Sequence, residues 1–523
     1  MSTEALPVFG IDLGTTNSCI ARVSAESGEP HVIPNADTIL TTPSVVFFDS
    51  PDNIVVGQTA KNSAVARPDL VCAHVKREMS KEPHLARTLT YHGNTYSPEA
   101  VSATILKKVV ADALQQEGLP ADSPVRAVIT VPAYFGAIGK NATLQAGKLA
   151  GIDVLYMAPE PVAAAIAYGF RRVTEPQTLL VYDLGGGTFD VTVVETDGAS
   201  AKVIAFDGER TLGGIDWDKA IVMWVREQVR TEKGVELPAD DLVLEQQLRE
   251  KAEEAKEALS RHKKALIPVG YQGKNYSFEL TVGKLEEITK AKLDITIDKT
   301  LAVKKAAEDK GAHIDRLLLV GGASKMPAVA RRLQEATNLK PDLYQPDLAV
   351  AKGAALLAGL IASGEFKVDM TGEADAAPPE SRIITMLTPK GLGIEAHNRV
   401  TQRDIVRYLV PKNSVLPATG SATFGTYEES QRHISVKIYE ERGEESELPG
   451  ENTLLHESPV DLPAGLRAGS PIEVIFRVDE AGVLHVFLKE LSSGQTSEIV
   501  PDKFSKTTDE DVLRLKPTLD AVV

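Results

Sequence analysis

Residues 9–17 read Phe-Gly-Ile-Asp-Leu-Gly-Thr-Thr-Asn, and residues 180–190 read Leu-Val-Tyr-Asp-Leu-Gly-Gly-Gly-Thr-Phe-Asp. In each stretch an apolar strand ends in Asp-Leu-Gly, turns through small residues and resumes as a strand. Without side chains at the turn, backbone N–H groups can approach a polyphosphate closely and point at it. Asp12 and Asp183 are too negative to touch phosphate, so they imply a cation between. Two such hairpins predict a duplicated lobe that grips one nucleotide from both sides.

The glycine spacing also excludes rival nucleotide sites. The chain has no G-x-x-x-x-G-K-[ST] sequence, which excludes a P-loop, and neither cluster is a strand-to-helix G-x-G-x-x-G. A single Asp-Leu-Gly turn would be read as an ordinary hairpin. Two matched copies, with a third glycine site at Gly321-Gly322, favour the nucleotide interpretation.

Composition limits the partners and the compartment. The 523 residues carry a net charge of −16, which argues against a nucleic-acid partner found by bulk charge. Two cysteines, Cys19 and Cys72, give no disulfide framework. The first residues show no signal pattern. The longest near-apolar run, 349–362, contains Lys352 and is too short to span a bilayer, so we expect a buried small-residue helix, no membrane partner and a cytoplasmic location.

The pattern along the chain predicts several domains. Up to about Phe366, strand patterns alternate with helical ones, as in α/β proteins, and beyond a polar, proline-containing stretch the pattern becomes all-β. Period-two alternation predicts strands at 434–439, 472–478 and 483–488, the last two joined by a hairpin turn at 479–482. We expect a nucleotide-binding domain at 1–368, a linker at 369–387, a β-sandwich at 388–503 and a short tail at 504–523.

A long charged helix is predicted at 242–265. Leu248, Ala252, Ala255 and Leu259 lie at helical spacing and form its buried stripe. The neighbouring face carries Glu253, Lys256 and Ser260, and the pattern alone indicates a solvated charged face.

Taken together, the ordered motifs resemble the heat shock protein 70 family of ATP-driven chaperones over nearly the whole chain. The matching stretches are 11–19, 130–135, 160–165, 183–190, 212–214, 321–322 and 345–347, with 392–395, 411–414 and 483–486 in the β region. The resemblance implies a multidomain protein, with an α/β actin-like ATPase domain of ribonuclease H-like duplicated lobes and a β-sandwich that holds extended peptide.

The resemblance also assigns roles around a nucleotide. Asp12 and Asp183 match the carboxylates that hold Mg²⁺ through its waters, and Lys76 matches the lysine beside the γ-phosphate. The residues that act in hydrolysis match Lys76, Glu160, Asp183, Thr188 and Asp190. The phosphate cradle matches Gly14, Thr15, Thr16, Asn17, Gly185, Gly186, Gly187 and Thr188. The nucleoside end matches Gly213, Gly214, Glu253, Lys256, Ser260, Gly321, Gly322, Lys325 and Asp347, which replaces the solvated-face interpretation of the helix.

Further residues match the coupling and peptide sites of the family. Interdomain coupling is assigned to Pro132, Lys140, Ile383, Ile384 and Leu387. The apolar peptide channel is assigned to Leu392, Ile394, Phe424, Ile434 and Val436, with His397 and Tyr427 as the two halves of an arch over the peptide. Without the resemblance, the channel residues would be read as plain core. A histidine in the arch predicts pH-sensitive peptide binding.

The chain departs from the family pattern at several positions. The helical lid over the peptide is expected to be nearly absent, and the linker at 381–388 lacks the usual run of leucines between aspartates. Tyr156 and Pro159 replace residues near the expected J-domain contact, Met386 stands at an acidic linker position, and Glu257 stands where some members place an arginine against the base.

The resulting hypothesis is an ATPase chaperone, with slow turnover, in which ATP switches affinity for unfolded apolar segments. Its cofactors would be ATP or ADP, Mg²⁺ and, as an additional candidate, K⁺. Its partners would be extended polypeptide, a J-domain co-chaperone and a nucleotide exchange factor. One alternative is a specialised member that binds ATP, hydrolyses it poorly and acts as a scaffold or co-chaperone. Another is a sugar kinase or actin-like filament protein with the same nucleotide fold.

Overall fold

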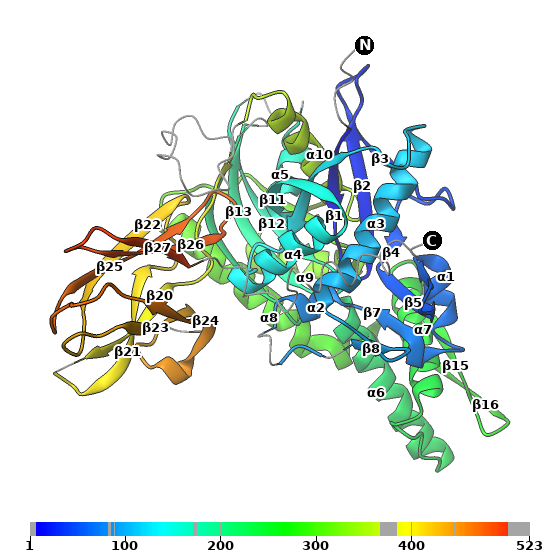
Figure 1. The fold of residues 1–523 in the computed structure, drawn as a ribbon. Helices are drawn as coiled ribbons and strands as arrows, with labels where there is room; N and C mark the ends of the chain where they lie inside the picture. The colour runs from blue at the N-terminus through cyan, green and yellow to red at the C-terminus, as the bar shows by residue number, and fades with distance from the viewer. Residues whose placement is uncertain are drawn as a thin grey trace.

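The computed structural model describes residues 7–81, 85–87, 89–170, 175–197, 200–366, 384–398, 400–443 and 445–499. A large mixed α/β part joins a smaller part built of strands (Figure 1). The mixed architecture expected from the sequence is therefore confirmed. The last linker residues, from Ile384 onward, lie among the described residues, whereas Ile383 and the predicted tail at 504–523 lie outside them.

Two sheets of the α/β part have the same strand order. The first runs β11-β10-β1-β2-β3, and the second runs β18-β17-β12-β13-β14 with β19 added at its edge. In each sheet a three-stranded antiparallel meander continues into two parallel strands. The first set is β1 (Val8–Asp12), β2 (Asn17–Val23), β3 (Pro30–Ile33), β10 (Val125–Val131) and β11 (Ile152–Pro159). The second is β12 (Gln177–Leu184), β13 (Phe189–Thr196), β14 (Ala201–Glu209), β17 (Arg316–Val320) and β18 (Pro341–Leu343).

Two helices of small residues pack between these sheets. They are α5 (Glu160–Gly169) and α10 (Ala349–Ala362), and the second is the buried helix expected from the apolar run. The packing is backbone to backbone at two glycines. A Cβ on Gly353 would lie 1.8 Å from the carbonyl oxygen of Ala163, and one on Gly10 would lie 2.0 Å from the Ala355 nitrogen. No described helix is long and apolar enough to cross a membrane.

The remaining elements surround the two sheets. The smaller strands are β4 (Thr42–Pro43), which pairs with β2, the sheet of β5 (Val45–Ser50), β6 (Asn53–Val56) and β7 (Val71–Ala73), and the hairpins β8 (Leu89–Tyr91) with β9 (Asn94–Tyr96) and β15 (Lys264–Tyr271) with β16 (Lys274–Thr281). The helices are α1 (Gln58–Ser63), α2 (Lys76–Met79), α3 (Pro98–Gln116), α4 (Ala137–Leu149), α6 (Gly214–Lys233), α7 (Leu242–Leu259), α8 (Val282–Glu308) and α9 (Pro327–Thr337).

The predicted helix at 242–265 is correct in its buried stripe but wrong at its end. Leu248, Ala252, Ala255 and Leu259 are buried, as expected. The helix stops at Leu259, and β15 begins at Lys264. The physical reason is that Ile267 and Val269 alternate with exposed residues and bury one face of the β15–β16 hairpin, which a continued helix would not do.

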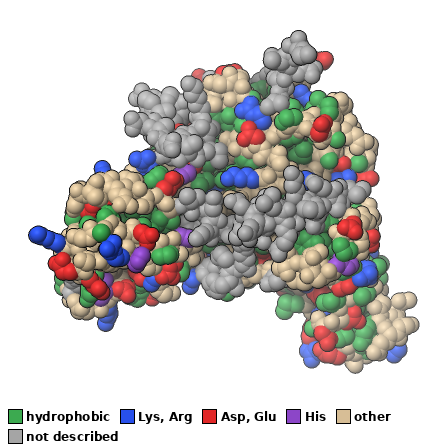
Figure 2. All heavy atoms as spheres, viewed as in Figure 1, with side chains coloured by type: hydrophobic (Ala, Val, Ile, Leu, Met, Phe, Trp, Pro, Cys, Tyr) green, Lys and Arg blue, Asp and Glu red, His purple; other side chains and the backbone are tan. Residues whose placement is uncertain are grey.

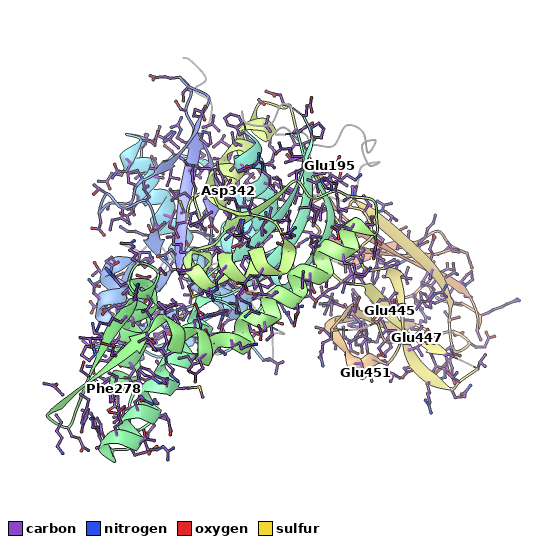
Figure 3. The ribbon with its side chains drawn as sticks, turned by 180° about the vertical axis from the view of Figure 1, so that it is seen from behind. Glu195, Phe278, Asp342, Glu445, Glu447 and Glu451 are labelled. Atoms are coloured by element: carbon purple, nitrogen blue, oxygen red, sulfur yellow. The ribbon has the colours of Figure 1, made fainter. Side chains whose placement is uncertain are left out.

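The β part consists of two four-stranded antiparallel sheets, β21-β20-β23-β24 and β22-β25-β26-β27. Buried side chains of both sheets belong to one apolar core. Figure 2 shows acidic and basic side chains interspersed on its surface, and in the reverse view (Figure 3) Glu445, Glu447 and Glu451 lie at the opposite end of the molecule from Phe278 on β16. The strands are β20 (Leu392–Asn398), β21 (Arg403–Val410), β22 (Ala418–Gly425), β23 (His433–Glu441), β24 (Asn452–Asp461), β25 (Pro471–Val478), β26 (Leu484–Glu490) and β27 (Thr496–Ile499).

The two glycines of α10 give a matched stability test. In Gly353→Ala the new methyl group would overlap the Ala163 carbonyl, so we expect a loss of about 1–3 kcal/mol from overpacking. In Gly359→Ala the nearest atom would be at 3.6 Å, and the higher helix propensity of alanine should stabilise by up to about 1 kcal/mol. Urea midpoints of the two variants measure the difference. Equal midpoints would contradict the packing of α10 on α5.

Candidate functional site

The turns of the two glycine hairpins meet between the lobes. A Cβ on Gly186 would lie 2.4 Å from the side chain of Thr16, and one on Gly187 would lie 2.4 Å from that of Thr15. Gly213 packs equally closely on the backbone of Gly186, since a Cβ there would lie 2.6 Å from it. The structure therefore brings together the predicted cradle residues of both halves, and glycine is required where the two turns pack against each other. Gly14, Asn17, Gly185 and Thr188 belong to the same two turns.

Four carboxylates lie beside this junction, of which Asp12 is partly exposed and the other three are buried. They are Asp12, at the end of β1, Glu160, at the start of α5, and Asp183 and Asp190, which face each other across the β12–β13 pair. One buried cation, Lys76 at the start of α2, forms an ion pair with Glu160. Further donors to the cluster are the Thr130 hydroxyl, 3.1 Å from Asp12 Oδ1, and the Tyr134 N–H, 3.0 Å from Asp190 Oδ1.

The charges of this cluster are not balanced within the chain. Burial, reinforced by the charge of Glu160, raises the pKa of Asp12 to about 7 and that of Asp190 to about 8. The same two causes raise the pKa of Asp183 well above its ordinary value. Burial alone would lower the pKa of Lys76, but the carboxylates of Glu160 and Asp12 outweigh it and raise that pKa. Such an excess of buried negative charge calls for another cation.

This donor set fits a hydrated divalent cation. Within the described residues, no group of three His, Cys, Asp or Glu side chains converges closely enough to hold a metal directly. Mg²⁺ usually keeps several of its waters and uses one or two carboxylates together with substrate phosphates. The carboxylates beside the glycine turns therefore suit Mg²⁺ with a polyphosphate.

The predicted nucleoside residues lie at the second-lobe side of the junction. Lys256 on α7 donates to the Gly214 carbonyl at 3.2 Å and forms an ion pair with Asp218 at 2.7 Å. Lys325 pairs with Asp347, and Gly322 lies close to that aspartate. Gly321 has φ +80°, and a Cβ on it would lie 2.4 Å from Asp183 Oδ1. A partly open pocket lies beside Lys256 and Ser260, and its other walls are largely apolar.

Two basic residues at the junction were not singled out from the sequence. Lys61 on α1 forms a 2.8 Å ion pair with Glu253 on α7, which links the two lobes across the site. Arg77 donates to the Gly187 carbonyl at 2.9 Å and forms an ion pair with Asp216. Arg77 directly follows Lys76, a predicted site residue, so the sequence could have placed Arg77 near the site. Lys61 lies in an ordinary polar helix, and nothing in its local sequence indicates a site residue.

Of the predicted coupling residues, Lys140, Ile384 and Leu387 lie where the two parts meet. Residues Ile384–Thr385 form β19, which pairs in parallel with β14, so the end of the linker extends the second sheet. Ile384, Met386 and Leu387 are buried in an apolar core that continues from α5 and α10 into the β part. Pro132 is buried at the end of β10.

Lys140 on α4 is buried against the β part. Its Nζ would lie 2.0 Å from a Cβ on Gly482, so it packs directly on that glycine. Burial lowers the pKa of Lys140 to about 8, although Asp479 and Glu440 partly offset the effect. Nearby, the hydroxyl of Tyr156 donates to the Glu480 carbonyl at 3.4 Å.

The predicted peptide residues fall into two groups. Leu392, Ile394 and Val436 are buried, whereas Phe424 and Ile434 are only half-buried. Strands β20 and β23 pair only where Leu392–Ile394 meets residues 438–440, so they separate beyond Ile394. The rings of His397 and Tyr427 meet edge to face with centroids 6.3 Å apart, and His397 Nδ1 lies 2.9 Å from Asp404.

Comparison with known proteins gives concordant matches. The model of the Hsp70 protein family matches residues 8–521. A chaperone protein DnaK from Thermosipho melanesiensis is similar, with 35% identity over 98% of this chain and 83% of the relative's length. Together with the two lobes and the appended β part, these matches show that the chain belongs to the Hsp70 family.

Proposed function

We propose that this chain is an ATP-dependent chaperone whose nucleotide site and peptide site communicate through the observed contact of the two parts. The observation that carries the proposal is the arrangement of the second sheet. Its β12–β13 hairpin supplies Asp183, the glycine cradle and Asp190, and its edge strand is the linker that leads into the β part. Nucleotide site and linker thus share one sheet.

The proposed division follows the sequence expectation. An actin-like ATPase domain of two ribonuclease H-like lobes comprises 1–368, a linker comprises 369–387, a peptide-binding β-sandwich comprises 388–503, and a tail follows at 504–523. The shared strand order of the two sheets supports the duplicated lobes, and the two antiparallel sheets around one core support the sandwich.

The proposed mechanism rests mainly on positioning and charge. ATP with Mg²⁺ would supply the phosphoanhydride bond and the divalent charge that neutralises the cluster. Gly14, Thr15, Thr16, Asn17 and Gly185 to Thr188 would hold the phosphates, and Asp12 and Asp183 would hold the hydrated cation. Glu160, Asp183 and Asp190 would orient the attacking water. Lys76 would lie beside the terminal phosphate, and its ion pair with Glu160 keeps both side chains in place.

The remaining assignments concern the rest of the nucleotide and the peptide. Gly213, Gly214, Glu253, Lys256, Ser260, Gly321, Gly322, Lys325 and Asp347 surround the nucleoside. The opening between β20 and β23 offers strand edges to an extended peptide, with half-buried apolar side chains beside them. K⁺, a J-domain co-chaperone, an exchange factor and a cytoplasmic location stay predictions.

The nucleotide assignment predicts the effect of Asp183→Asn. The variant removes one negative charge from the proposed cation site, so we expect about 2–4 kcal/mol less transition-state stabilisation and a fall in ATP turnover of about thirty-fold or more. Asp342→Asn, at an exposed position of the same sheet (Figure 3), is the matched control and should keep its turnover. Circular dichroism checks that both variants fold. Parental turnover in Asp183→Asn would contradict the site.

The peptide assignment predicts the effect of Ile434→Thr. Because Ile434 is half-buried, the change should leave the fold intact and remove apolar contact with a bound peptide. We expect a labelled leucine-rich heptapeptide to bind more weakly by about 1 kcal/mol, roughly fivefold in Kd. Ile475→Thr, at a half-buried position of the other sheet, controls for general effects. Equal losses of peptide affinity in both variants would contradict the assignment of Ile434 to the peptide site.

The buried lysine predicts that contact between the two parts strengthens as pH rises. The pKa of Lys140 is about 8 in the contact and should return toward its ordinary value of 10.5 when the parts separate. Contact therefore releases a proton between these values, and it should become more favourable as pH rises above about 8. Amide exchange of 384–388 between pH 7 and 9.5, corrected for intrinsic rates, measures this. Lys140→Met should abolish the trend, and a trend that survives would refute it.

A further inference from the structure

Helix α4 of the ATPase part receives its N-terminal cap from the β part. The N-cap residue, Gly136, has no side chain to offer, and the first turn contains no acidic residue. The N–H of Ala137, the first helical residue, donates instead to Oε1 of Glu440 on β23 at 2.8 Å. A helix N-terminus presents unpaired N–H groups and favours a negative charge. Glu440, which belongs to the β part, supplies both a hydrogen-bond acceptor and a negative charge.

This contact is enclosed and depends on local shape. Glu440 is 3% exposed, and its second oxygen, Oε2, accepts from the buried Nζ of Lys390 at 2.9 Å. A Cβ on Gly136 would lie 2.3 Å from Glu440 Oε1, so only glycine lets the carboxylate approach. Lys140 on α4 faces the same small cavity between the parts. Burying this carboxylate is tolerable because both oxygens are hydrogen-bonded.

The capped helix is directly connected to the nucleotide site. The segment before α4 contains Tyr134, whose N–H donates to Asp190 Oδ1 at 3.0 Å. On the other side, Glu440 lies four residues beyond Val436 on the same strand β23. The path from Val436 to Asp190 therefore consists of two hydrogen bonds and two short stretches of chain. The hydrogen bonds are Ala137 N–H to Glu440 and Tyr134 N–H to Asp190.

We propose that Glu440 is a positioning residue for the ATPase site. By capping α4 it holds the segment 132–137, and through the Tyr134 N–H it holds Asp190. When the β part moves away, Ala137 loses its acceptor and the segment loosens. The proposal rests on the proposed coupling of ATP and peptide, and it identifies the contact that carries the coupling.

A matched pair of double variants separates the cap from the buried charges. Lys390→Met with Glu440→Gln removes both charges but keeps an oxygen that can accept from Ala137. Lys390→Met with Glu440→Leu removes the same charges and the acceptor. In hydrogen exchange of the full chain with ATP, we expect the amides of 134–140 to exchange about tenfold faster in the leucine pair than in the glutamine pair, since a buried N–H loses its partner. Equal exchange would overturn the cap.

A functional readout distinguishes positioning from mere stabilisation. We expect the ratio of ATP turnover with and without a leucine-rich heptapeptide to stay parental in the glutamine pair and to fall to about one in the leucine pair. A parental ratio in both pairs would overturn the positioning role. If the unmodified chain shows no peptide effect, the proposed coupling fails, whereas the exchange comparison still decides whether Glu440 caps α4. Glu498→Gln, at an exposed position of β27, controls for loss of a surface carboxylate.

Discussion

The constraint on which the rest depends is the crowding of four carboxylates, three of them buried, around one buried lysine where two glycine hairpins meet. The lobes can approach this closely because Gly186 and Gly187 leave room for Thr16 and Thr15. Glu160, Asp183 and Asp190 are buried there, Asp12 is partly buried, and Lys76 is the buried cation that pairs with the cluster. The pKa values of the three aspartates are raised as a result. An unliganded site of this kind carries an electrostatic cost, so a ligand that brought a divalent cation would stabilise the closed junction.

Much of this arrangement could be predicted from the sequence because it depends on patterns of residues that are close together in the chain. Asp-Leu-Gly turns mark hairpins, period-two alternation marks β23, β25 and β26, and the small-residue run marks α10. The end of α7 was missed because helical and strand patterns overlap at 260–265, and pairing with β16 decides between them. Lys61 and Glu440 could not be assigned from pattern because their partners are 192 and 303 residues away.

Local patterns also could not reveal how the two parts meet. The linker sequence indicated a polar stretch with a few apolar residues, yet Ile384, Met386 and Leu387 are buried in a core shared by both parts. Ile384 is buried where β19 pairs with the edge of β14, which is a property of the assembled sheet. Leu387 pairs instead with Val415 of the β part.

The contact between the parts combines two kinds of interaction that behave differently when it opens. The apolar linker side chains favour contact in proportion to the area they remove from water. Lys140, Lys390, Glu440 and the Ala137 N–H gain little net free energy from contact, because water can solvate each of them after separation. Apolar burial therefore supplies the attraction, while the polar groups keep the contact from becoming irreversible and define its geometry. A nucleotide or a peptide that binds differently when the contact is open and when it is closed would bias this contact.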